Sequence, residues 1–250
     1  MTVIQRSLSH RRRIRAISTY ISAYSHKVLD LGPIAYWPLG EATGTVARCL
    51  VNSAQNGAYA SDVSGWPPAT GIGDGNTAPT FDGTHDYVDI FSATLQAAFD
   101  GDEGTLALWF KVADAAVWTD GEERQSVVML ADATNYILLL RPSTNNVYNY
   151  THRAGAAWKS KNKQPVSPTT WMPVAITWTA SADECRYYWD GDQTGLDDTL
   201  GEWAGNLDTN RTLIGASHKN PLRLWRGSLA HVALFDKPLT PAQIAAIAAL

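Results

Sequence analysis

Two pairs of aspartates have the spacing that a catalytic carboxylate pair on one strand face would need. Asp100 and Asp102 form one pair, and Asp190 and Asp192 form the other. Side chains two residues apart on a strand point to the same side, and cleavage of a glycosidic bond requires one carboxyl group as acid and a second as nucleophile or base. Each pair flanks a glycine in an expected turn, so we expect solvated turn residues rather than catalytic groups.

Other patterns that support catalysis are absent from the sequence. It contains no GxSxG, HExxH or P-loop spacing. A dinucleotide site requires a strand before its glycine-rich run and a helix after it, and the sequence predicts neither around the run at 71–75. The sequence therefore predicts a protein that is not an enzyme. The two cysteines, Cys49 and Cys185, are too few for a disulfide framework. We expect two buried thiols, with one disulfide between them as the alternative.

Aromatic side chains offer a second kind of chemistry, since an exposed ring can stack on the C–H face of a sugar. Five aromatic residues in or beside expected loops are candidates for ligand binding: Trp66, Trp118, Tyr148, Tyr150 and Trp158. The alternative is that these rings fill a core or lie beneath loops. Lys159, Lys161 and Lys163 follow the last of them and predict a solvated loop.

Charge divides the chain into a basic arm and an acidic body. Residues 1–29 hold six of the 20 Lys and Arg and none of the 24 Asp and Glu. Basic residues interleaved with aromatic ones can bind single-stranded nucleic acid, but the acidic body argues against a nucleic-acid partner. No run approaches the ~18 apolar residues of a membrane span, so we expect no membrane partner.

The arm has the spacing of one helical face. Its apolar residues step by three and four: Ile14, Ile17, Ile21, Tyr24 and Val28. Its central arginines are Arg11, Arg12, Arg13 and Arg15. About 15 residues of this kind are marginal as an isolated helix, and arginines at a helix start oppose the helix dipole. We therefore expect an acidic groove on a neighbouring subunit to order the arm, with packing on its own body as the alternative.

The body shows the pattern of an all-β protein. Short apolar or alternating runs predict strands at 34–37, 87–91, 105–112, 126–130, 136–140, 147–151, 173–179, 186–189, 212–215 and 227–235. Asp190-Gly191 predicts a two-residue type I′ hairpin. Residues 60–79 predict a long loop. One helix is expected at 241–249, because Thr240 and Gln243 form a capping box around Pro241.

Seven segments in order resemble the laminin-G-like, concanavalin-A-like lectin domains. They are 35–41 (AYWPLGE), 81–88 (FDGTHDYV), 104–112 (GTLALWFKV), 170–178 (TWMPVAITW), 187–191 (YYWDG), 212–215 (TLIG) and 225–235 (WRGSLAHVALF). The resemblance implies a two-sheet antiparallel jelly-roll sandwich over residues 32–250, with a short C-terminal helix and a basic, partly helical N-terminal arm over 1–31. A fold of this kind hosts many functions and identifies no ligand by itself.

The resemblance also implies where calcium would bind. Asp82 keeps an acidic position of the family, but Asn52 stands where aspartate is usual, and His231 replaces another acid. Loss of two carboxylates weakens a site for a cation that prefers hard oxygen ligands. We therefore expect no cofactor, with calcium at Asp82 and Asn52 as a weak alternative. Asp82 is expected to close its own turn.

Domains of this type, joined to a short N-terminal segment, resemble those of bacteriophage structural proteins. On that basis the sequence predicts a virion protein of a tailed bacteriophage, docked on other virion subunits through its arm as a homo-oligomer within the particle. The body would be displayed outward as a head decoration, fibre or tail component, where it could bind a surface glycan. The alternative is a soluble or cell-surface glycan-binding lectin or adhesion module.

Overall fold

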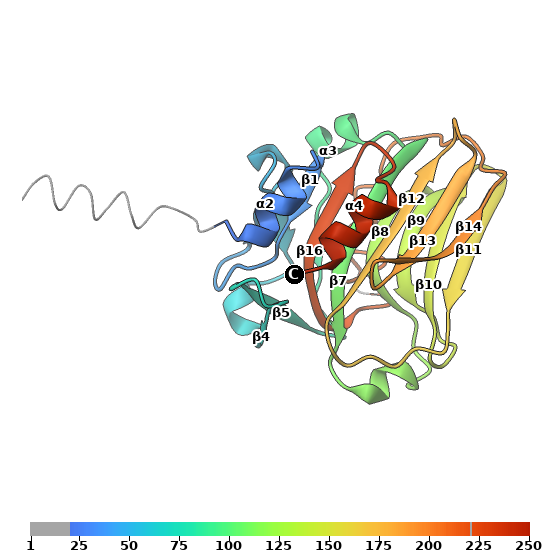
Figure 1. The fold of residues 1–250 in the computed structure, drawn as a ribbon. Helices are drawn as coiled ribbons and strands as arrows, with labels where there is room; N and C mark the ends of the chain where they lie inside the picture. Colours follow the sequence, from blue (N-terminus) through green and yellow to red (C-terminus); the bar gives the residue numbers. More distant parts are fainter. Residues whose placement is uncertain (1–20, 221) are drawn as a thin grey trace, which may run out of the picture.

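The computed structural model describes residues 21–220 and 222–250, which form two antiparallel sheets packed face to face (Figure 1). In sheet A the strand order is β14-β13-β12-β7-β16-β5-β4, and β1 pairs with β16. Its strands are β1 (Ala35–Trp37), β4 (Pro68–Thr70), β5 (Thr77–Asp82), β7 (Glu103–Val112), β12 (Met172–Thr179), β13 (Glu184–Trp189), β14 (Asp192–Asp197) and β16 (Arg226–Phe235).

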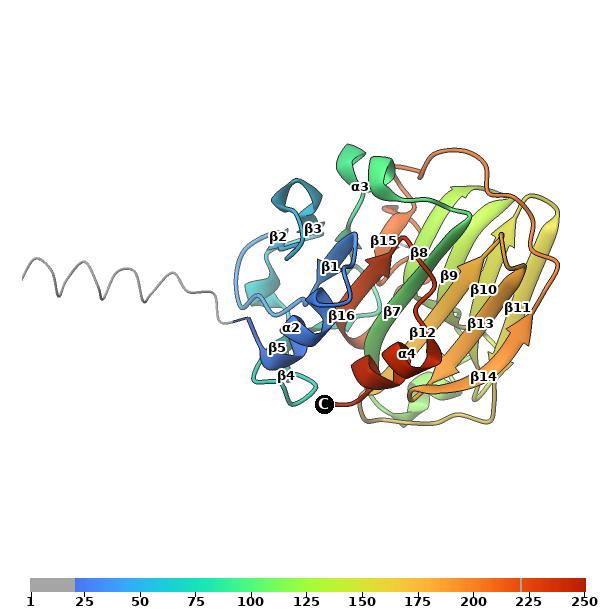
Figure 2. The ribbon, with the colours of Figure 1, turned by 45° about the horizontal axis from the view of Figure 1, so that its top comes forward.

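Sheet B has the order β11-β10-β9-β8-β15-β6-β3-β2 (Figure 2). Its strands are β2 (Val46–Ala47), β3 (Gly57–Tyr59), β6 (Val88–Asp89), β8 (Arg124–Asp132), β9 (Asn135–Arg141), β10 (Tyr148–Ala154), β11 (Ala157–Lys163) and β15 (Thr212–Ile214). The predicted all-β sandwich is confirmed, and each of the ten predicted strands overlaps an observed one.

Alternation along the strands builds the core between the sheets. Leu106 of β7 pairs in register with Ile176 of β12, and Leu108 pairs with Val174. Because alternate side chains point to opposite faces, these four lie together on the inner face. The alternating pattern of the sequence predicts nine core positions, and all are buried: Trp37, Phe81, Leu106, Leu108, Val174, Ile176, Leu213, Leu229 and Val232. Leu213 lies in a smaller, separate cluster with Ala216 and Leu224. The two cysteines are buried free thiols, as expected.

Local signals account for the hairpin and for the C-terminal helix. Asp190 and Gly191 both have positive φ, 54° and 83°, as a type I′ turn between β13 and β14 requires. Helix α4 (Pro241–Ala248) begins at the expected capping box of Thr240 and Gln243. In the part of the chain that the structure describes, the other helices are α2 (Ala23–Leu29) and α3 (Ala93–Ala98), with single 3₁₀ turns at η1 (Ser53–Gln55), η2 (Val63–Gly65) and η3 (Ala115–Trp118).

The long loop predicted at 60–79 is wrong in part. It contains the turn η2 and the strand β4, and β5 begins at Thr77. The glycines and prolines that suggested a loop lie mainly around a short hairpin, in which Pro68 pairs with Pro79 and Thr70 pairs with Thr77. Prolines fit here because the hairpin is at the end of sheet A, where an edge strand leaves some backbone N–H groups unpaired.

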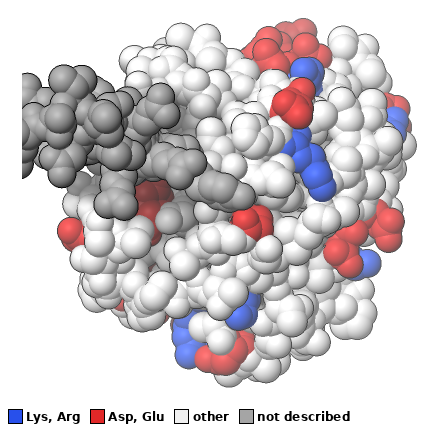
Figure 3. All heavy atoms as spheres, turned by 60° about the vertical axis from the view of Figure 1, so that its left-hand side comes forward, with Lys and Arg blue, Asp and Glu red and all other residues white. Residues whose placement is uncertain are grey.

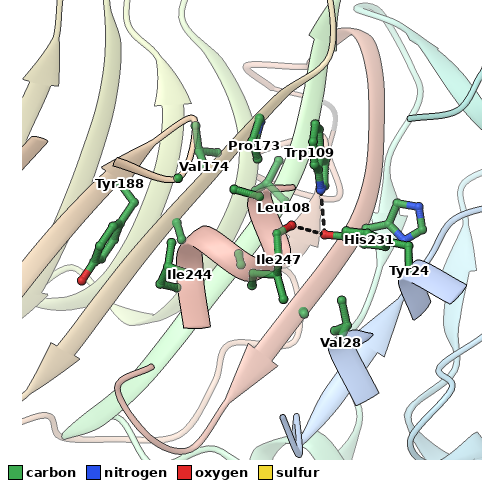
Figure 4. A pocket seen from close by; sticks show the side chains of 15 residues that line it. Tyr24, Val28, Leu108, Trp109, Pro173, Val174, Tyr188, His231, Ile244 and Ile247 are labelled. Carbon is green, nitrogen blue, oxygen red and sulfur yellow. Dashed lines mark hydrogen bonds between the residues drawn. The ribbon is translucent and has the colours of Figure 1, made fainter. Parts of the chain in front are cut away.

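Helices α2 and α4 cover the outer face of sheet A, and Figure 4 shows their junction. Tyr24 and Val28 of α2 are buried there among outward residues of β7, β12 and β16. The Tyr24 hydroxyl donates to the Ile247 carbonyl at 2.7 Å and accepts from Trp109 Nε1 at 2.7 Å. The expectation that only a partner covers the apolar face of the arm is therefore wrong for Tyr24 and Val28, which pack on their own domain.

A buried polar chain joins α2 to the sheet. The Ser25 hydroxyl lies 3.0 Å from the Tyr36 hydroxyl, which lies 2.6 Å from His231 Nδ1. His231 Nε2 is 3.4 Å from a carboxylate oxygen of Asp74, whose side chain is also buried. Burial alone would raise the pKa of Asp74, but hydrogen bonds from His231 and Ser22 outweigh it and hold this pKa below its usual value. The chain ties together α2, β1, β16 and the β4–β5 hairpin.

The core position Ile176 gives a test of the packing. Ile176→Ala should lower the free energy of unfolding by about 2–5 kcal/mol, because it removes buried methylene groups and leaves a cavity. Leu196→Ala, at an exposed leucine of β14, is the matched control. Denaturant unfolding measures both variants. A loss at Ile176 no larger than at Leu196 would contradict the observed register of β12.

The N-terminal helix gives a second test. A chain that lacks residues 1–29 loses Tyr24 and Val28, and burial of each such side chain contributes ~1.5–3 kcal/mol. We expect its free energy of unfolding to fall by about 3 kcal/mol or more. A chain that lacks only residues 1–20 keeps every contact described above and serves as the control. Equal stability of the two truncated chains in denaturant titrations would refute a structural role for α2.

Candidate functional site

Four of the five aromatic residues predicted for ligand binding lie in the interior, and their assignment as exposed binding rings is wrong. Trp66 lies between Tyr59 and Phe81, with ring centroids 5.3 and 5.2 Å away. Trp118 packs on Phe110 and donates through Nε1 to the Pro168 carbonyl at 2.9 Å. Trp66 directly follows η2 and Trp118 ends η3, and both are buried, so a loop position in the sequence does not mean an exposed ring.

Tyr148 and Tyr150 point inward from β10. Tyr148 stacks on Phe110 with ring centroids 4.7 Å apart, and its hydroxyl lies 2.7 Å from the Ser126 hydroxyl. The Tyr150 hydroxyl donates to the Tyr188 carbonyl of β13 at 2.7 Å. Burial raises the pKa of both phenols well above the ordinary value, so they stay neutral and hydrogen-bonded. These two rings fix β10 against the opposite sheet.

Trp158 differs from the other four, because 63% of its surface is exposed. It lies on β11, the edge strand of sheet B, where the sequence predicted a solvated lysine loop; that prediction is wrong. Lys159, Lys161 and Lys163 alternate with the outward side chains and are half-buried. Lys161 packs over Gly195 of β14, where the edges of the two sheets meet. Inward lysines on an edge strand hinder pairing with another chain.

The outward side chains of β9, β10 and β11 form a continuous surface, which we call the open face. Its members are Tyr136, Leu138, Asn149, Thr151, Arg153, Trp158, Ser160 and Asn162. The outer side of sheet A lies beneath α2 and α4. Near β15, the outer side of sheet B lies beneath Ala216 and Leu224. Trp158, Ser160 and Asn162 are exposed, so the open face is accessible along β11.

One row of the open face combines two aromatic rings with a cation. Arg153 of β10 pairs in register with Tyr136 of β9 on one side and with Trp158 of β11 on the other. Its guanidinium carbon lies 5.8 Å from the centroid of the Tyr136 ring. Nε donates to the Gly155 carbonyl at 3.3 Å and Nη1 to the Ala133 carbonyl at 3.1 Å. Two carbonyls and the Tyr136 ring therefore hold the guanidinium in one place.

A second part of the open face is a hydrogen-bonded polar group. Asn149 Nδ2 donates to the Ser160 hydroxyl at 2.8 Å and to Asn162 Oδ1 at 2.7 Å. The Thr151 hydroxyl donates to Asn149 Oδ1 at 2.7 Å. Asn149 and Thr151 are nearly buried, whereas Ser160 and Asn162 are exposed. The inner pair thus fixes the outer pair, which presents amide and hydroxyl groups to solvent.

The sequence analysis found Trp158 but missed its neighbours on the open face. A usable signal was present in β10, where Tyr148, Tyr150 and His152 alternate with Asn149, Thr151 and Arg153. That alternation separates inner from outer residues. It does not show which residues of β9 and β11 lie beside them, because the register between strands is set by the turns and by the buried faces.

The two residues considered for calcium serve local turns. Asp82 accepts backbone hydrogen bonds from Thr84 at 2.7 Å and from His85 at 2.8 Å. Asn52 accepts from Ala54 at the start of η1. Within residues 21–220 and 222–250, no three His, Cys, Asp or Glu side chains are grouped as metal ligands would be. Asp82 and Asn52 thus each close a local turn, and Asp82 does so as the sequence predicts.

The paired aspartates also lie in turns or beside them. Asp190 is in the β13–β14 turn, and Asp192 is the first residue of β14. Asp102 accepts from the backbone N–H of Trp203 at 2.8 Å, and Asp100 accepts from the backbone N–H of Asp102 at 3.0 Å. Neither pair belongs to the open face, whose members include no Asp or Glu.

The residues predicted to bind virion subunits lie mostly outside the described part of the chain. Arg11, Arg12, Arg13, Arg15, Ile14 and Ile17 belong to the segment before Ile21, and only Ile21 is described, in a groove beside Ser25 and Leu50. The described residues on this side of the molecule carry few charges, in small groups of both signs (Figure 3). None of the helices in the described residues has the length and apolar character of a membrane span.

The two packed antiparallel sheets define a β-sandwich domain of the lectin type. The chain belongs to the concanavalin A-like lectin/glucanases superfamily, because the Laminin_G_3 family model matches residues 82–245. The predicted resemblance is confirmed. A comparison with curated proteins finds no match.

Solved structures share the fold at low sequence identity. One is domain 4 of AbnA, a GH43 extracellular arabinanase from Geobacillus stearothermophilus, in complex with arabinotriose, with 13% identity, a TM-score of 0.62, and coverage of 86% of this chain and 98% of that one. A second is the CBM40 of Ruminococcus gnavus IT-sialidase bound to α2,3 sialyllactose, with 11% identity, a TM-score of 0.53, and coverage of 68% and 96%.

A third neighbour is the binding domain of Paraclostridial Mosquitocidal Protein 1. It has 11% identity and a TM-score of 0.63, and the match covers 88% of this chain but 52% of that one. Identities this low show a common fold and do not by themselves assign a ligand.

One buried group behind the open face makes stability depend on pH. His152, on the inner side of β10, is 2% exposed, and neither ring nitrogen has a hydrogen-bond partner among the described residues. Burial lowers the pKa of His152 from 6.5 to about 4. Between these values the unfolded chain binds a proton that the folded chain does not bind. This histidine therefore makes the folded state less stable as pH falls from about 6.5 to about 4.

His152→Leu removes the group that titrates. Over that pH interval, the wild type should lose up to about 3 kcal/mol more stability than the variant, since one pKa unit corresponds to ~1.4 kcal/mol. Guanidinium unfolding at pH 7.5 and at pH 4.5 measures the difference. His85→Leu, at an exposed histidine, is the control for loss of an imidazole. The same pH dependence in wild type and His152→Leu would rule out this origin.

Proposed function

We propose that this chain is a carbohydrate-binding domain that holds a saccharide on the open face of sheet B. The fold supports this proposal, since the superfamily is one of lectins and glucanases, and two of the structural neighbours were solved with an oligosaccharide bound. The observation that carries it is Trp158, a large aromatic side chain exposed beside a fixed polar group.

The open face has the two kinds of group that sugar recognition requires. The flat ring of Trp158 can stack on the apolar C–H face of a pyranose or furanose. Ser160 and Asn162, which follow it on the same side of β11, can then exchange hydrogen bonds with sugar hydroxyls. Their positions are set by Asn149, so little side-chain freedom is lost when a sugar binds.

The proposed role is binding without catalysis. Glycoside hydrolysis needs two carboxyl groups on either side of the bond to be cleaved. The members of the open face include neither Asp nor Glu, and the paired aspartates of the sequence lie elsewhere. A saccharide held on this face would therefore meet aromatic, amide, hydroxyl and guanidinium groups.

The place of this domain in a larger assembly stays a prediction. Docking on a tailed-bacteriophage particle as a homo-oligomer depends on the six basic residues of 1–29, and all but Lys27 lie before the described residues. On that hypothesis the chain is a virion component that presents the open face to a surface glycan of the host. A secreted or cell-surface lectin would use the same face.

Trp158→Ala tests the proposed function. We expect saccharide affinity to fall at least about tenfold, with little change in unfolding free energy, because the ring is mostly exposed. Calorimetry would measure binding to arabinotriose, α2,3-sialyllactose, xylan oligosaccharides and oligogalacturonate. Trp158→Tyr keeps a ring and should retain much of the affinity. Leu196→Ala, at another exposed apolar residue, is the control for nonspecific effects.

Either of two results would contradict the proposal. One is binding that Trp158→Ala leaves unchanged, which would place the saccharide elsewhere. The other is no binding by the wild type to a broad panel of neutral and acidic glycans.

A further inference from the structure

We infer that Arg153 makes the open face selective for acidic saccharides, by binding the carboxylate of a uronic or sialic acid unit. This inference rests on the proposed function and adds a ligand class to it. Arg153 lies in register between two aromatic residues, Tyr136 and Trp158. Among the described residues it has no acidic partner in an ion pair.

The guanidinium of Arg153 is fixed by the protein on one side. Its Nε–H and one N–H of Nη1 donate to the Gly155 and Ala133 carbonyls. The guanidinium carbon Cζ lies over the Tyr136 ring, 5.8 Å from the ring centroid. An arginine has five N–H donors in a planar fork, so three stay free: two on Nη2 and one on Nη1. A carboxylate can accept two parallel hydrogen bonds from such a pair of nitrogens.

The acidic residues near this end of the open face do not neutralise Arg153. Asp132, the last residue of β8, accepts from Thr134 and Asn135 and forms no ion pair with Arg153. The backbone carbonyl of Glu202 lies near Gly155, and among the described residues the Glu202 side chain forms no ion pair with Arg153. Five other arginines of the described residues form ion pairs, among them Arg124 and Arg141 with Asp120. Arg48 and Arg211, like Arg153, form none, but of these three only Arg153 belongs to the open face.

The neighbours of Arg153 favour a sugar acid over a free anion. The Trp158 ring is the registered partner of Arg153 on the next strand, so one saccharide unit can stack on the indole while its carboxylate reaches the guanidinium. A small anion would bind to the Arg153 guanidinium without contacting the Trp158 ring. An arginine that is already held in place by two carbonyls and a ring loses little freedom on binding, which favours a defined geometry over general attraction.

The test compares each acidic glycan with its own uncharged form. Polygalacturonate and polysialic acid are measured beside their methyl esters, which keep the chain and remove the charge. We expect the wild type to bind at least one acid tenfold or more tightly than its ester. Arg153→Gln should abolish that preference, whereas binding of the ester should stay within twofold. Arg153→Lys keeps the charge without the planar fork and should retain only part of the preference.

The controls separate this inference from the proposed function. Arg48→Gln removes an exposed arginine that follows β2, at the opposite edge of sheet B, and should leave the preference intact. Trp158→Ala should weaken binding of acid and ester alike. If binding depends on Trp158 but the wild type does not prefer either acid, the inference fails while the proposed function stands. A preference for acid that survives Arg153→Gln also overturns it.

Two further outcomes are decisive. Dextran sulfate distinguishes a carboxylate site from general attraction to anions: tighter binding of dextran sulfate than of either acid, lost in both Arg153→Gln and Arg48→Gln, refutes the inference. If Arg153→Gln does not fold, as judged by thermal unfolding, the comparison of acid with ester in the wild type and in Arg153→Lys still decides it.

Discussion

The anchoring of β10 in the core is the constraint on which the open face depends. Tyr148 stacks on Phe110, and the Tyr150 hydroxyl donates to the opposite sheet, so this strand can neither slide nor rotate. Because side chains alternate, a one-residue slip would exchange the two faces of the strand. The buried tyrosines thus hold Asn149 and Arg153 outward. The positions of the side chains on the open face are therefore set by packing in the interior.

The need to cover apolar side chains explains why the accessible outer face belongs to sheet B and not to sheet A. Sheet A carries apolar outward residues, including Ala107 and Ala175, that need cover, and α2 and α4 provide it. The buried chain from Ser25 through Tyr36 and His231 to Asp74 holds α2 in that place. With both helices on one side, the outward residues of β11 meet solvent on the other.

The fold could be predicted from the sequence much better than the site. Strands with strong alternation, such as 105–112, and the capping box at Thr240 depend on local signals, and both were found. The edge strand β11 was missed because its alternate residues are lysines, which bury only their stems and give no apolar pattern. The aromatic residues beside loops were misassigned because spacing shows which rings share a face but not what covers that face.

The contrast between Trp158 and the other predicted aromatics bears on function. Tyr148 and Tyr150 are fully buried and hydrogen-bonded, so packing accounts for them completely. Packing does not require an aromatic residue at position 158, because any polar residue could occupy the outward side of an edge strand. An exposed indole there gains little from burial and adds an apolar patch on an edge, where a protein risks self-association. Stability therefore gives no reason for Trp158, whereas a stacked sugar ring beside Arg153 does.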